Sequence, residues 1–293
     1  MYTVDPGAKV MAAARPALSV IVVTVDRLQL VERLFSSLAR QTCMDFEVLL
    51  MHAPTLSHEA VAALCRRFPE LPIRAYATAD TCLSRSRNAA LRHLRGALFC
   101  IADDDCVYLP DTVARALEVF GQHAQAGAVL GQPLELDTPP EPAGQAIAVR
   151  SLRALFQNCP SYVHFYRSAV LATVEGFDES LGVGSATPWQ SGEETDFLLR
   201  VTKAGFGVWR APAVMVQHPR PNLRKLQAQK VYGYAAGRMR LLRKHSCTWP
   251  FILVNIAYPL AVLPCECLTA LLHIIRYRWL MFWGRLRNVR RAK

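Results

Sequence analysis

The apolar positions of the first hundred residues alternate between strand-like and helix-like spacing. Residues 17–25 form an apolar, β-branched run, which predicts a strand, and residues 28–38 repeat apolar positions every three or four residues, which predicts a helix. Further strands and helices alternate after these, at 46–51, 57–68, 73–77, 84–94 and 97–102. This alternation predicts an α/β fold with a mostly parallel central sheet and helices on both of its faces.

The spacing becomes less regular in the second half of the chain. A proline-rich segment at 133–142 predicts a loop, and a helix at 195–204 and a strand at 208–216 complete the globular part. We therefore expect a short N-terminal extension, a globular domain and a C-terminal helical tail, at 1–16, 17–225 and 226–293.

Three consecutive aspartates, Asp103, Asp104 and Asp105, follow the strand that ends at Ala102. Parallel sheets bind ligands beyond the carboxyl ends of their strands, and two carboxylates one residue apart there can turn toward one hard cation. Without a cation, three crowded anions would raise one another's pKa values and destabilise the fold. The alternative is a polar loop that caps the next helix.

Two other features have both a structural and a chemical interpretation. The acids Glu193, Glu194 and Asp196 begin a predicted helix, where the helix dipole favours them, but a carboxylate there could also take a proton from a hydroxyl. His218 follows the last predicted strand, and beside a carboxylate-bound metal it becomes a plausible third ligand.

A further helix start, at residues 84–88, carries Arg85 and Arg87. Helix N-termini attract anions, and the planar guanidinium group suits phosphate. A solvated helix start is the equally good alternative.

The order of these motifs resembles the family 2 glycosyltransferases of the GT-A fold. The segments that carry the resemblance are LSVIVVTVDR at 18–27, LFSSLARQ at 34–41, SRNAAL at 86–91, LFCIADDD at 98–105, GFDE at 176–179, SGEETDFLLR at 191–200, AGF at 204–206 and His218. Together they cover residues 17–220, and several motifs in the family's order are more specific than any one of them.

The resemblance implies an inverting transfer of a sugar from a nucleoside diphosphate donor. It implies that Asp103, Asp105 and His218 hold Mg²⁺ or Mn²⁺ on the diphosphate, and that Glu194 is the base, with Glu193 and Asp196 as the other candidates. The positions that match the family's nucleotide-sugar contacts are Thr24, Asp26, Arg87, Asn88, Asp103 and Asp104.

Two positions depart from the family's pattern. The Asp-rich segment that reads the nucleobase is replaced by Met51-His52-Ala53-Pro54, so the identity of the donor's nucleobase stays open. The position of the catalytic base holds Glu where Asp is more usual, so the choice among Glu193, Glu194 and Asp196 as catalytic base stays open as well.

Charge is distributed unevenly along the chain, whose net charge is +11. Residues 1–220 hold 20 Lys and Arg against 22 Asp and Glu, whereas residues 221–293 hold 14 against the single acid Glu266. The longest apolar run, 248–275, lies inside this basic tail, so anionic lipid fits it better than nucleic acid. The chain begins without a secretory signal, and nine cysteines without a C-x-x-C pair predict neither a disulfide framework nor a zinc site.

We expect the tail to contact the cytoplasmic face of the membrane through residues 238–293. The apolar run has room for one crossing but not two, and both of its flanks are basic. Because three prolines interrupt it, in-plane helices or a re-entrant hairpin fit better than a simple span, with aromatic residues at the interface. Those aromatic residues are Trp249, Tyr258, Trp279 and Trp283. The alternative is a buried helical subdomain.

The leading hypothesis is therefore an enzyme that adds a sugar to a glycan or lipid-linked acceptor, as in cell envelope polysaccharide biosynthesis. A polyprenyl-phosphate sugar synthase shares the fold and donor but uses a phosphate as acceptor. A catalytically inactive, membrane-bound scaffold is the alternative from another class.

Overall fold

The computed structural model describes residues 15–140, 144–156, 160–222, 226–262 and 272–289. Most of the predicted N-terminal extension, the middle of the apolar run and the last four residues therefore lie outside the described residues. The chain divides into two compact units. The sheet unit comprises 1–81, 85–177 and 197–220, and the helical unit comprises 82–84, 178–196 and 221–293.

Within the described residues, the sheet unit is built on one nine-stranded sheet with the order β3-β2-β1-β4-β8-β6-β9-β5, and β7 pairs with β9. Its first four strands are parallel, namely β3 (Ile73–Ala77), β2 (Phe46–His52), β1 (Leu18–Thr24) and β4 (Leu98–Asp103). The remaining strands pair in mixed directions, namely β8 (His164–Arg167), β6 (Ala126–Glu135), β9 (Gly207–His218), β5 (Val107–Tyr108) and β7 (Ile147–Ala148). The parallel half is the part that the alternating pattern predicted.

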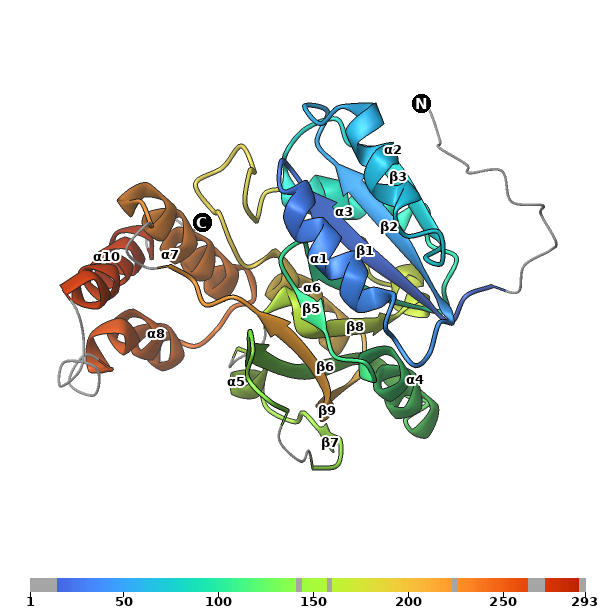
Figure 1. Cartoon of the computed structure of the whole chain (residues 1–293). Helices are drawn as coiled ribbons and strands as arrows, with labels where there is room; N and C mark the ends of the chain where they lie inside the picture. The colour runs from blue at the N-terminus through green and yellow to red at the C-terminus, as the bar shows by residue number, and fades with distance from the viewer. Residues whose placement is uncertain (1–14, 141–143, 157–159, 223–225, 263–271, 290–293) are drawn as a thin grey trace. The chain divides into compact units, whose positions relative to one another are not determined.

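Helices cover both faces of the parallel strands, with α1 and α2 on one face and α3 on the other (Figure 1). The helices that begin in the first two thirds of the chain are α1 (Leu28–Leu38), α2 (His58–Arg66), α3 (Leu83–Leu91), α4 (Thr112–Gln122), α5 (Leu152–Leu155) and α6 (Glu193–Lys203). Two short 3₁₀ helices lie at Ser161–Val163 and Ser168–Ala172. The predicted limits of α1 are confirmed, and Ser57 caps α2 by accepting from the Ala60 amide at 3.1 Å.

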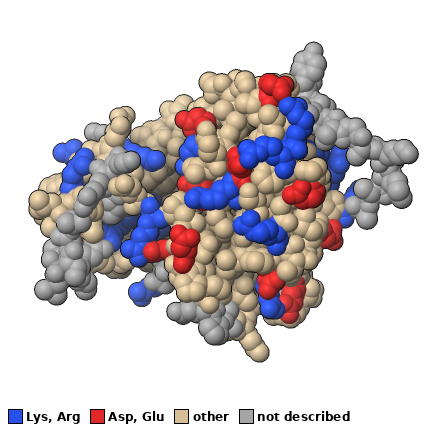
Figure 2. Space-filling model, in the orientation of Figure 1, with Lys and Arg blue, Asp and Glu red and all other residues tan. Residues whose placement is uncertain are grey.

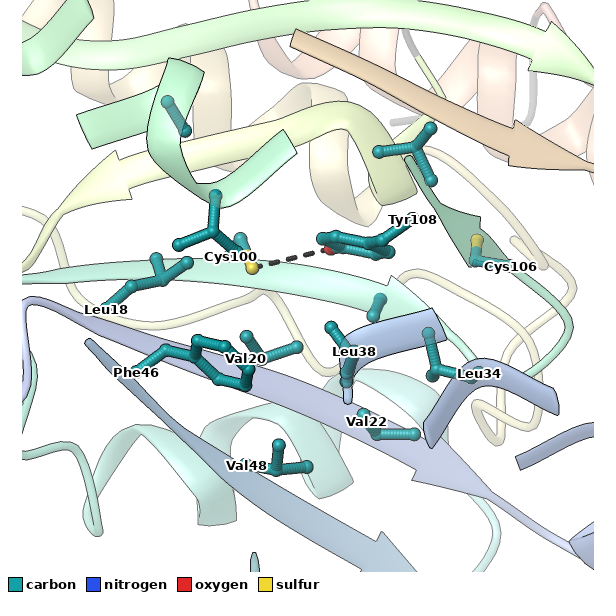
Figure 3. Close-up of a cluster of buried hydrophobic side chains, with 14 of the residues drawn as sticks. Leu18, Val20, Val22, Leu34, Leu38, Phe46, Val48, Cys100, Cys106 and Tyr108 are labelled. Carbon is teal, nitrogen blue, oxygen red and sulfur yellow. Dashed lines mark hydrogen bonds between the residues drawn. The ribbon is translucent and has the colours of Figure 1, made fainter. Parts of the chain in front are cut away.

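The apolar side chains of α1 pack into the core of the sheet unit. Leu34 and Leu38 lie in the same buried cluster as Val20 and Val22 of β1 (Figure 3). Such burial contributes about 1.5 to 3 kcal/mol for each large apolar side chain. Cys100 belongs to the same cluster, and burial raises the pKa of its thiol to about 12. This thiol is therefore a small core group rather than a nucleophile.

The predicted loop at 133–142 begins too early, because β6 continues to Glu135 and Pro133 pairs with Val216 of β9. The register between β6 and β9 already shifts between Leu130 and Gln132. A proline is tolerated where the ladder is irregular, so here it does not end the strand.

The helical unit contains α7 (Ala228–Lys244), α8 (Trp249–Ala261) and α10 (Leu272–Asn288). α10 packs on both α7 and α8. None of the helices within the described ranges is both long and apolar enough to cross a membrane. Acidic and basic side chains are interspersed over the sheet unit (Figure 2), whereas α7, α8 and α10 contain no acid at all.

Candidate functional site

The carboxyl ends of β2, β1 and β4 lie at one edge of the sheet. In the ladder, Thr24 lies opposite His52 and Val23 lies opposite Asp103. The three strands therefore end together, and the residues that follow β4 emerge beside Thr24. This is the position that the sequence predicted for the chemistry.

Asp104 is held by Thr24 and by Arg27. The Thr24 hydroxyl donates to Asp104 Oδ2 at 2.8 Å, and the Arg27 guanidinium pairs with both oxygens of Asp104. Burial raises the pKa of Asp104 to about 6, although Thr24 and Arg27 both lower it. Asp104 is 2% exposed, so its main role is to fix the turn that carries its two neighbours.

The two outer aspartates face His218, which ends β9. His218 Nε2 lies 2.9 Å from Asp105 Oδ1 and 4.0 Å from Asp103 Oδ2. The structure thus brings together the three residues predicted to bind metal. Burial lowers the pKa of His218, but the two carboxylates outweigh this and raise it above its ordinary value.

The His218 ring is fixed on two sides. Its Nδ1 lies 2.7 Å from the Pro219 carbonyl oxygen, and its face stacks on Tyr162 at 4.5 Å between centroids. With Nδ1 donating to a carbonyl, Nε2 is turned toward the carboxylates. Metal-binding histidines are commonly held in this way.

The three residues predicted to bind metal do not form a ready-made metal site. Among the residues that the structure describes, no group of three or more such side chains is arranged so that it could hold a metal ion. However, the Asp105 Oδ1 atom is buried and has no aligned hydrogen bond, although His218 Nε2 lies 2.9 Å away. Adjacent ligands of a six-coordinate ion with bonds of about 2.1 Å lie about 3 Å apart, so this spacing suits a shared hard cation.

Arg87 supports Asp103 from inside the sheet unit. Arg87 is buried, and its Nη2 donates to Asp103 Oδ1 at 3.4 Å and to Ser161 Oγ at 3.3 Å. Its guanidinium also lies over the Phe177 ring at 5.7 Å. Arg87 therefore orients a predicted metal ligand, and its contact with the nucleotide sugar stays a prediction.

The other predicted nucleotide contacts differ in their surroundings. The Asn88 amide donates to the Phe177 carbonyl at 2.9 Å and accepts from the Phe177 amide at 2.7 Å, so both of its ends hold the Gly176–Phe177 turn. Asp26 is exposed beyond β1. His52 is buried, and among the described residues its Nε2 has no hydrogen-bond partner.

The three acids at the start of α6 belong to the helical unit and have different environments. Asp196 is 0% exposed and pairs with Lys244 at 2.7 Å and with His245 at 2.8 Å. Glu193 is also buried, whereas Glu194 is partly exposed. Asp196 thus ties the start of α6 to the end of α7, and Glu194 is the acid that solvent reaches most easily.

The turn before Glu194 rests directly on α7. A side chain at Gly237 of α7 would collide with the backbone of Ser191, and Gly192 has φ +96°, which favours glycine. Nearby in the same unit, Arg238 has a pKa of about 10, lowered by burial and by Arg285 but raised by the charge of Glu194. Glu194 therefore has a fixed backbone and a cationic neighbour.

Sequence reasoning missed Arg27, Ser161 and Tyr162. Arg27 Nη1 donates to Asp105 Oδ2 at 3.1 Å, and Ser161 Oγ lies 3.3 Å from Asp103 Oδ1. The position of Arg27 directly after Asp26 at a strand end was a usable signal. Nothing in the sequence around Ser161 and Tyr162 marks them, because they reach the site through the 3₁₀ helix.

Comparisons with known proteins give one family and several similar folds. The profile of the family described as Glycosyl transferase family 2 matches residues 19–158. A comparison with curated proteins finds no match.

Among solved structures, the mannosyltransferase PcManGT from Pyrobaculum calidifontis, in complex with GDP-Man and Mn²⁺, is 15% identical, with a TM-score of 0.66 over 96% of this chain and 89% of that one. Residues 1–349 of S. aureus TarS in complex with UDP are 18% identical, with a TM-score of 0.58 over 94% and 88%. The same TarS fragment in complex with UDP-GlcNAc is 16% identical, with a TM-score of 0.55 over 94% and 89%. At these identities the similarity establishes the fold.

Proposed function

Through residues 19–158 the chain belongs to glycosyl transferase family 2, and we propose that it is an inverting, metal-dependent enzyme. Its donor is a nucleoside diphosphate sugar, and its acceptor is a hydroxyl of a glycan or of a lipid-linked glycan. The transfer takes place at the cytoplasmic face of the cell membrane.

One observation carries the proposal. The buried Asp105 Oδ1 and the His218 Nε2 face each other at 2.9 Å without an aligned hydrogen bond, beyond the ends of three parallel strands. Asp103, Asp105 and His218 would hold Mg²⁺ or Mn²⁺ there, and that ion would neutralise the charge of the departing diphosphate. Arg27 and Arg87 keep the carboxylates in position by pairing with the oxygens that face away from His218.

Among the three acids at the start of α6, we assign Glu194 as the base that activates the acceptor. It is partly exposed, whereas Glu193 and Asp196 are buried and Asp196 is already paired with Lys244 and His245. The charge of Glu194 raises the pKa of Arg238, so a cation stands beside this carboxylate. A carboxylate can accept the proton of an attacking hydroxyl. The displaced diphosphate and the attacking oxygen lie on opposite sides of the anomeric carbon in an inverting reaction.

Calorimetry of donor binding tests this function. The full chain is titrated with UDP-, GDP- and dTDP-sugars with and without Mn²⁺, because similar folds bind GDP-Man and UDP-GlcNAc and the segment at His52 leaves the base open. We expect Mn²⁺-dependent binding of one donor class. Asp105→Asn should weaken it by roughly 100-fold, since even neighbours of metal ligands change metal affinity by about 10- to 100-fold.

Glu118→Gln is the matched control, because Glu118 is a half-exposed acid on α4 that pairs only with exposed groups in the sheet unit. It should bind the donor as the parent does. Metal-independent binding, or an unchanged affinity in Asp105→Asn, would remove the cation from the proposed function.

A further inference from the structure

Helix α8 exposes an entirely apolar face. Its exposed residues recur at helical spacing, and each is aliphatic, aromatic or proline. The largest are Trp249, Leu253, Val254 and Tyr258, which are 54%, 58%, 62% and 54% exposed. Soluble monomers rarely leave a contiguous surface of this kind uncovered.

The polar side of α8 faces inward. Asn255 is 7% exposed, and its Oδ1 accepts from Arg238 Nε at 3.0 Å and Nη2 at 2.9 Å. The Arg285 guanidinium of α10 donates to the Asn255 carbonyl. The rotation of α8 about its axis is therefore fixed, because turning the apolar face inward would leave two buried guanidinium groups without these acceptors.

A basic group borders this face, and aromatic and basic side chains are exposed on α10. The Arg243 guanidinium lies over the Trp249 ring at 5.3 Å, so a cation stands at the first turn of α8. On α10, Trp279 and Trp283 are 44% and 43% exposed. Arg276 and Arg287 are exposed on the same helix.

We infer that the exposed face of α8, with Arg243 beside it, is a docking surface for a bilayer that contains anionic phospholipid. Thirteen residues of helix are about 20 Å long, which is too short to cross the hydrocarbon core, so α8 lies in the plane of the interface. Tryptophan and tyrosine prefer that depth, and arginine pairs with the phosphate of the headgroups. Residues 221–293 carry 14 basic residues against one acid, which matches the negative charge of such a surface.

This inference deepens the proposed function, on which it rests for its purpose. An enzyme lying on the bilayer would reach a lipid-linked acceptor without extracting it from the membrane. Docking itself depends on α8 and α10 and not on the nucleotide site, so the two can be tested separately.

Sedimentation with vesicles tests the docking surface. The full chain is mixed with vesicles of phosphatidylcholine alone or with 30 mol% phosphatidylglycerol, a fraction of roughly one lipid in three chosen to give a clear anionic charge. We expect binding to the anionic vesicles. In Leu253→Gln/Val254→Gln it should weaken roughly tenfold or more, since each buried aliphatic side chain contributes that order of affinity.

Ile147→Gln is the matched control, because Ile147 is 60% exposed on β7 of the sheet unit and undergoes the same apolar-to-amide change. It should leave vesicle binding unchanged. Equal binding of the double variant and the parent would overturn the inference, and so would a parent dimer that the double variant converts to a monomer, because a second copy would then cover the face. Donor affinity is measured on the same samples in solution, so a failure of the nucleotide site is distinguished from a failure of docking.

Discussion

The sheet unit and the helical unit place their polar groups differently. In the sheet unit, apolar side chains fill the space between the helices and the strands, and carboxylates gather where β1, β2 and β4 end. In the helical unit, Asn255 and two arginines are buried against one another, while α8 turns leucine, valine and tryptophan outward. The first arrangement is that of an enzyme core with polar groups gathered at one edge of its sheet. The second arrangement is expected of a helix that lies at a membrane interface.

The comparison also distinguishes two kinds of acidic residue. Asp196 pairs with Lys244 and His245 of its own unit. Asp105 pairs with Arg27 through Oδ2 and faces His218 through Oδ1, but that buried Oδ1 has no aligned donor. Acids that look alike in a sequence therefore differ in how completely their oxygens are paired.

The largest effect is expected for Glu194→Gln. It removes the proposed proton acceptor while keeping size and fold, so kcat should fall by about 10² to 10⁴. Donor affinity by calorimetry should stay unchanged. Steady-state transfer to a hydroxyl acceptor measures the effect.

Asp196→Asn is the comparison variant for Glu194→Gln. It removes a buried ion pair and should therefore lower the free energy of unfolding by about 3 kcal/mol. A full rate in Glu194→Gln would assign the base elsewhere. Transfer to a lipid phosphate that survives in the same variant would favour the synthase instead.

The next effect sets one leucine of each unit side by side. Leu34→Ala in the core of the sheet unit should lower the free energy of unfolding by about 2 to 5 kcal/mol, since it opens a cavity. Leu253→Ala on α8 should change it by less than about 0.5 kcal/mol. Urea unfolding monitored by circular dichroism compares the two, and equal losses would mean that α8 is buried in solution.

A smaller effect is expected for Asn255→Ala. Arg238 would lose the acceptor of two hydrogen bonds in a buried setting, which costs about 1 to 3 kcal/mol. The helical unit should unfold at a lower midpoint. Limited proteolysis between α7 and α8 measures this loss. Val254→Ala, on the opposite face of α8, is its control and should leave the cleavage rate unchanged.

Much of the sheet unit could be predicted because its information is local. The strands and helices up to β4 follow from apolar periodicity. Asp103, Asp105 and His218 were grouped by the resemblance to the family, and the structure brings them together. Arg27 was marked in the sequence only by its place directly after Asp26 at a strand end. The contribution of Tyr162 could not be predicted, since it reaches His218 from a 3₁₀ helix.

The helical unit was harder to predict. Residues 248–275 hold few polar side chains, so periodicity gives little indication of which face of α8 is buried. That choice is made by Arg238 and Arg285, which are 17 and 30 residues away from Asn255. The grouping of residues 178–196 with the C-terminal helices likewise depends on contacts such as that between Asp196 and Lys244.

The close approach of Gly237 to Ser191 has a consequence for how this enzyme can be dissected. The turn that leads to Glu194 leans against the backbone of α7, with no room for even a methyl group between them. The C-terminal region therefore cannot be removed without consequence. A fragment that lacks it would also lack the backbone of α7, against which the turn before Glu194 packs. Shortened or tail-swapped versions should be judged inactive only after a glycine-bearing helix has been restored at that place.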